Sequence, residues 1–97
     1  MTRAVLPYRG TADLALIFQG EQGAPELEAW TLTLLVSRTP SAGILDVVLS
    51  QGTPGLDLRR RQLHAARITL PDGAVVTGQV SYVSPVVDSF VLVEDGA

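Results

Sequence analysis

Three residue types are missing from this 97-residue sequence: cysteine, lysine and asparagine. Without cysteine the chain has neither a disulfide framework nor a thiolate metal site. All seven basic residues are arginines, and the lack of both lysine and asparagine is typical of a GC-rich genome. Arginine also forms planar, forked hydrogen bonds that lysine cannot form, so the bias suits a protein interface as well.

An excess of positive charge is lacking too: the formal net charge is −3 and the sequence pI is about 4.8. This charge argues against nucleic acid as a general partner. No apolar run approaches the roughly 18 residues that a membrane span needs, and residues 1–7 do not have the pattern of a signal peptide. We therefore expect no membrane partner and a protein that is soluble in the cytoplasm of the cell that makes it.

The combinations of residues that usually form catalytic or metal-binding sites are also missing. His64 is the single histidine, and the nearest acidic residue along the chain is Asp57. Nucleophilic catalysis needs a base beside a serine or threonine, and no Gly-x-Ser-x-Gly elbow is present. The scattered acidic residues do not form the alternating oxygen ligands of a calcium loop. The sequence therefore predicts no enzyme, no catalytic residue, no cofactor and no metal site.

Aliphatic residues are what the chain has in abundance. Hydrophobic residues make up 46% of the sequence, yet aromatic residues make up 5%. Valine and isoleucine favour half-buried strands. A chain of this length is expected to form one domain over residues 1–97 with a modest core. So much apolar surface on a small domain predicts that part of it lies in an interface with other subunits.

The order of apolar and polar residues predicts an all-β domain. Strands are expected over residues 11–18, 30–38, 44–50, 67–70, 74–83 and 86–93. A short helical turn is expected over 25–29, and either a helical turn or an edge element over 56–66. Gly78, in the middle of a predicted strand, is typical of a bulge or a close backbone approach. Six to seven strands at this spacing predict a small antiparallel β-sandwich or barrel, Ig-like or SH3-like.

Two predicted strands show which side chains face the core. The apolar faces consist of Ala12, Leu14, Leu16 and Phe18 in the first strand, and Trp30, Leu32, Leu34 and Val36 in the second. Most aromatic residues, Phe90 and Tyr82 included, are expected in the core. Tyr8, beside Arg9 near the N-terminus, is the aromatic residue that we expect at an interface.

One charge cluster stands out, formed by Arg59, Arg60 and Arg61. Its functional interpretation is a contact with an acidic partner surface, a carboxylate or a phosphate. The alternative is a solvated loop or helix face. The predicted partner-binding residues are therefore Tyr8, Arg9, Arg59, Arg60 and Arg61.

Several short motifs in the first half carry a resemblance to a phage module. They are Arg9-Gly10-Thr11 followed by Asp13, then Gly23-Ala24-Pro25-Glu26-Leu27, then Val36-Ser37-Arg38. Over about residues 8–50 the chain resembles the β-sandwich domain at the start of phage baseplate upper proteins. The second half lacks the Gly-x-Tyr strand with which that family continues. Residues 66–73, 76–80 and 90–96 instead look like the middle strands of small SH3-like or Sm-like barrels.

The resemblance implies a non-enzymatic structural protein of a phage particle: a capsid decoration, head–tail connector, tail or baseplate component. Its partners would be capsid, tail or other virion subunits, in a homo-oligomer or symmetric assembly, and its location would be the virion. The alternative is an SH3-like or Sm-like adaptor module that binds a peptide or RNA. The sequence leaves the virion component, the partner, the oligomeric state and the strand order open.

Overall fold

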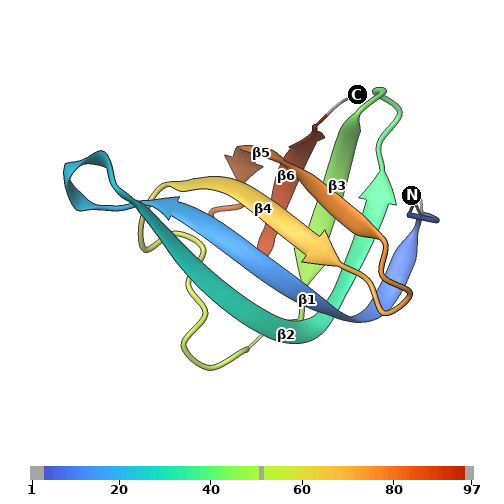
Figure 1. Cartoon of the computed structure of the whole chain (residues 1–97), viewed down its shortest axis with the longest axis horizontal. Helices are drawn as coiled ribbons and strands as arrows, with labels where there is room; N and C mark the ends of the chain where they lie inside the picture. Colours follow the sequence, from blue (N-terminus) through green and yellow to red (C-terminus); the bar gives the residue numbers. More distant parts are fainter. Residues whose placement is uncertain (1–3, 51, 96–97) are drawn as a thin grey trace.

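Two three-stranded meanders make up the barrel (Figure 1). The computed structural model describes residues 4–50 and 52–95. The strands are β1 (Tyr8–Gln19), β2 (Pro25–Arg38), β3 (Ile44–Leu49), β4 (Leu63–Thr69), β5 (Val75–Val83) and β6 (Ser89–Glu94). All neighbouring pairs are antiparallel, and the order β1-β2-β3-β6-β5-β4 closes where β4 pairs with β1. The all-β prediction is confirmed, and of the two architectures the structure is the barrel.

The barrel interior is filled by alternate residues of its strands, as the two-residue period of a strand requires. Phe18 and Phe90 are fully buried there among aliphatic side chains. The core includes Ala12, Leu14, Leu16, Leu32, Leu34, Val36, Leu45, Val47, Leu49, Ala66, Ile68, Val76 and Leu92. The inward faces predicted for the first two strands are therefore confirmed, except that Trp30 is only partly buried against the core.

The tip of the β1–β2 hairpin, residues 19–25, extends beyond the barrel as an arm (Figure 1). The pairing of the hairpin runs without interruption from Tyr8 opposite Val36 to Gln19 opposite Pro25. A helical turn was expected over residues 25–29, but these residues form the start of β2. The reason is that β1 supplies paired backbone along their whole length. The helical turn lies in the tip itself, at the short 3-10 segment η1 (Glu21–Gly23).

The ambiguous segment 56–66 divides into a loop and a strand. Residues up to Gln62 form turns of the β3–β4 loop, and β4 begins at Leu63. Leu58 is buried in the core and fixes this loop against the barrel. The loop joins β3 to β4, two strands that are not neighbours in the barrel, so it passes across one end of it.

Gly78 marks a close backbone approach, as its place in the strand predicted. A Cβ atom at this position would lie 2.2 Å from the carbonyl oxygen of Val93 on β6. Soon after it the register of β5 against β6 shifts between Val80 and Tyr82, which is a β-bulge. Within the described residues, no helix is long and apolar enough to cross a membrane.

Candidate functional site

The barrel wall opens at one end, between β4 and β5. These strands pair from Thr69 opposite Val75 to Ala65 opposite Gln79. The start of β4 then pairs with β1 alone, whereas β5 continues beside β6 as far as Val83. Val80–Val83 therefore has no neighbouring strand, among the described residues, on the side away from β6. We call Val80–Val83 the open edge.

A groove of about 490 Å³ lies beside the open edge. One wall is the open edge, and the other comes from the end of the β3–β4 loop and the start of β4. The loop-side residues are Leu58, Arg59, Arg61, Gln62 and Leu63. We call this space the edge groove, and it combines a backbone edge, apolar side chains and two arginines.

Tyr82 is the aromatic residue of the edge groove, and its side chain is turned outward. Val76 and Gly78 are buried, so simple alternation along β5 would also bury residue 82. The bulge after Val80 inserts one extra residue, and a one-residue slip exchanges the two faces of a strand. Tyr82 is consequently 58% exposed, so its expected place in the core is wrong.

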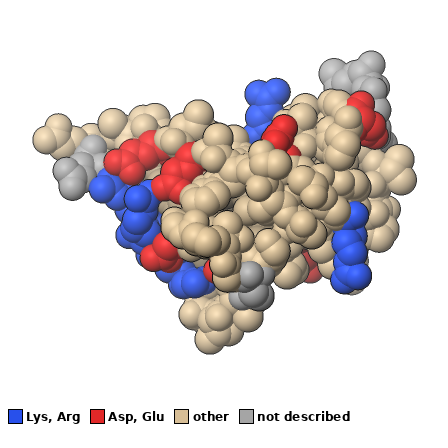
Figure 2. Space-filling model, turned by 90° about the horizontal axis from the view of Figure 1, so that it is seen from below, with Lys and Arg blue, Asp and Glu red and all other residues tan. Residues whose placement is uncertain are grey.

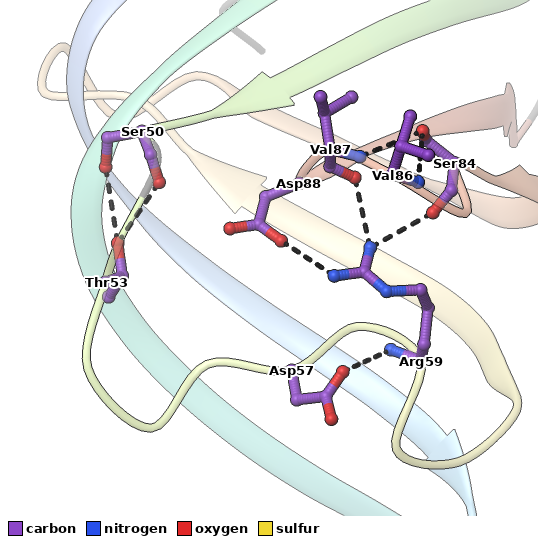
Figure 3. A network of polar contacts seen from close by, with 8 residues as sticks. All are labelled: Ser50, Thr53, Asp57, Arg59, Ser84, Val86, Val87 and Asp88. Carbon is purple, nitrogen blue, oxygen red and sulfur yellow. Dashed lines mark hydrogen bonds and ion pairs between the residues drawn. The ribbon is translucent and has the colours of Figure 1, made fainter.

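Arg59 connects the β3–β4 loop to the β5–β6 turn (Figure 3). Its Nη1 donates hydrogen bonds to the carbonyl oxygens of Ser84 and Val87, at 3.0 and 3.1 Å. Its Nη2 lies 3.4 Å from Oδ1 of Asp88, and its backbone N–H donates to Oδ1 of Asp57 at 2.9 Å. These contacts hold the loop wall of the edge groove near the end of the open edge.

Replacing Arg59 with alanine should loosen this wall without unfolding the barrel. Hydrogen bonds that involve a charged group contribute about 1.5–3 kcal/mol when buried, and partial exposure here reduces the expected loss to about 1 kcal/mol. Amide hydrogen exchange should become faster in residues 57–60 and 84–88. Arg67→Ala, which removes an exposed arginine that forms no ion pair with any described residue, is the matched control. Equal exchange in the two variants would contradict the role of Arg59.

Arg60 and Arg61 attach the same loop to β2. Arg60 pairs with Glu28, and its guanidinium carbon lies 5.6 Å from the centroid of the Phe18 ring. Arg61 donates from Nη1 to Oε1 of Glu26 at 2.7 Å. Exposed ion pairs of this kind contribute about 0–1 kcal/mol each. Figure 2 shows basic and acidic residues intermixed at the end of the molecule that carries the arm, so the three arginines form no uniformly basic patch.

Tyr8 and Arg9 lie far from the arginine cluster. Tyr8 begins β1 opposite Val36, whereas the partners of Arg60 and Arg61 are near the other end of β2. The Tyr8 ring packs against the core, and its hydroxyl donates to the carbonyl oxygen of Thr11 at 2.7 Å. Arg9 is exposed and forms no ion pair with a described residue. The five predicted partner-binding residues thus form two separate groups.

His64 is exposed at the start of β4 and lines a hollow of about 420 Å³ at the base of the arm. Residues 4–50 and 52–95 contain no cluster of three or more histidine, cysteine, aspartate or glutamate residues that could hold a metal ion.

Comparison with known proteins finds no match. No family model, no curated protein and no solved structure matches this chain. Sequence reasoning singled out Arg59 and Arg61, which line the groove, but not Tyr82 or the open edge. Gly78 was the available signal, because it predicted an irregularity in the strand that ends with them.

Proposed function

We propose that this protein is a non-enzymatic structural component of a phage particle that acts by protein–protein contact. The observation that carries this proposal is the open edge of β5, which includes the exposed Tyr82. An unpaired strand edge presents a row of backbone N–H and C=O groups that can pair with another chain. A partly exposed aromatic side chain next to it provides apolar area for the same contact.

The outer surface next to the open edge supports this proposal. Val48 on β3 and Val93 on β6 are exposed, and so is Val86 in the β5–β6 turn. Tyr82, Val48 and Val91 line a further hollow of about 380 Å³ on this side of the barrel. Exposed apolar residues that form a contiguous patch are typical of a binding surface.

The resemblance of residues 8–50 to a phage baseplate domain suggests that the assembly containing this protein is a phage particle. The motifs that carry it lie on the β1–β2 hairpin: Arg9-Gly10 on β1, and Val36-Ser37-Arg38 at the end of β2. In a capsid or tail, a small domain is repeated by symmetry, so one modest contact is made many times. Decoration, connector, tail and baseplate roles all have this property.

Mass spectrometry of gradient-purified particles from the source culture tests the proposed role. We expect the protein in the particle fraction at a fixed stoichiometry to the major capsid or tail subunit. Its copy number would then distinguish a decoration protein from a connector. Particles that form normally and lack the protein would contradict the structural role.

The edge groove also favours a second candidate, an adaptor module that binds a peptide. A strand edge with a loop wall opposite is a known arrangement for capturing an extended segment. RNA is less well supported, because a polyanion needs an extended basic surface, and acidic partners are interspersed among Arg59, Arg60 and Arg61. The net charge of −3 is also unfavourable for binding a polyanion.

A further inference from the structure

We propose that the edge groove takes up an extended protein segment that bears an acidic side chain. The segment would pair with the open edge as an additional strand, and its carboxylate would contact Arg61, with Arg59 close by. This inference rests on the proposed protein-contact function, and it adds the face used and the chemistry of the partner.

The backbone of the open edge sets the form of the partner. Val80–Val83 covers four residues, or roughly 13 Å at about 3.3 Å per residue. The edge groove beside it, at about 490 Å³, falls in the range of about 300–1,000 Å³ that is usual for ligand sites. Backbone pairing supplies affinity in this mode of binding, and alternate side chains of the added strand supply specificity. The occupant is therefore a short extended segment.

The side chains of the groove set the partner's charge. Arg59 and Arg61 line it, and none of its lining residues is acidic. Among the residues that the structure describes, Arg61 donates one hydrogen bond, to Glu26, whereas a guanidinium has five N–H groups. Its side chain is 32% exposed, so the remaining donors are within reach of a bound segment. A carboxylate can accept two parallel hydrogen bonds from such a group.

A second copy of the chain fits this groove less well than a foreign segment. Pairing of two open edges would bring the loop of each copy into the groove of the other. The groove has no acidic lining residue, so a second copy paired in this way would offer Arg61 no carboxylate. A separate segment with a carboxylate supplies this missing partner and gains charge-assisted hydrogen bonds.

The test begins with an mRNA-displayed library of random short peptides selected on the full chain. We expect enriched peptides to combine alternating β-branched residues with an aspartate or glutamate. A fluorescein-labelled enriched peptide then gives dissociation constants by fluorescence anisotropy. Arg61→Ala and Tyr82→Ala should each weaken binding by about tenfold or more. Arg67→Ala, which removes one positive charge outside the groove, should leave the constant within about twofold.

Glu26→Gln separates a direct contact of Arg61 from a role in holding the loop. This variant removes the carboxylate partner of Arg61 and leaves the arginine in place. If Arg61 contacts the peptide carboxylate, binding should be unchanged or tighter in Glu26→Gln. If the ion pair only positions the loop, Glu26→Gln should weaken binding as much as Arg61→Ala does, which would overturn the proposed contact.

Three further results would also overturn the inference. They are the absence of any enriched peptide, enriched peptides without an acidic residue, and a dimer in light scattering that Tyr82→Ala converts to a monomer. The last result would assign the groove to a second copy. These outcomes are independent of the particle test. If the protein is present in particles but binds no peptide through the open edge, this inference alone is refuted. If it binds such a peptide but is absent from particles, the particle role alone is refuted.

Discussion

Gly78→Ala is expected to lower the free energy of unfolding by about 3 kcal/mol, because a methyl group at this position has no space. An added Cβ would lie 2.2 Å from the carbonyl oxygen and 2.8 Å from the carbonyl carbon of Val93. Both are backbone atoms of a paired strand, so no rotation of a side chain relieves the overlap. Gly78 is opposite Ala66 on β4 and Glu94 on β6, so moving its strand disturbs pairing on both sides. Urea unfolding followed by circular dichroism measures the loss.

Gly73→Ala provides the matched control for this prediction. Gly73 lies in the turn between β4 and β5 with a φ of 90°, and no atom lies within 4 Å of an added Cβ. Its replacement should destabilise by about 1 kcal/mol, through backbone conformation alone. If Gly78→Ala destabilises no more than Gly73→Ala, the close approach of β5 to β6 is wrong.

Phe18→Ala is expected to destabilise the protein by about 3–5 kcal/mol, since it removes a fully buried aromatic side chain and leaves a cavity. Total stabilities of small proteins are about 5–15 kcal/mol, so this loss is a large part of the whole. Phe18 lies where the arm meets the barrel, opposite Leu63 on β4 and beneath the guanidinium of Arg60. The melting temperature should fall by roughly 12 °C or more.

Ile17→Ala is the control for Phe18→Ala, because Ile17 is the preceding residue of the same strand and faces outward. It is only partly buried, so its truncation should have an effect of about 1 kcal/mol. Thermal unfolding of both variants under the same conditions makes the comparison. Equal losses would mean that the β1–β4 junction has no specific dependence on the Phe18 ring.

Local sequence patterns were sufficient to predict most of the strands and their inward faces. The alternation in β1 and β2 is clear because one side of each strand packs on the core. Closure of the barrel was not predictable in the same way. It depends on pairing of β1 with β4 and of β3 with β6, between residues far apart in sequence, and neither pairing has a local signal. The extension of β2 back to Pro25 likewise depends on its partner strand rather than on its own residues.

The candidate site was predictable only in part for a similar reason. The three consecutive arginines are visible in the sequence, but their acidic partners Glu26, Glu28 and Asp88 are 35, 32 and 29 residues away. The outward position of Tyr82 depends on a bulge, which reverses the faces that simple alternation assigns. The open edge exists because β4 and β5 stop pairing before β5 ends, and no local sequence pattern marks that point.

The two pairings that close the barrel also determine when it can form during synthesis. β1 and β2 can make a hairpin as soon as both have left the ribosome, but β3 has no outer neighbour until β6 has been made. Contacts between residues so distant in sequence make folding slow compared with that of helical proteins of equal size. Until β6 is made, the outer edge of β3 lacks the strand that covers it in the barrel, and an unpaired edge of this kind favours aggregation.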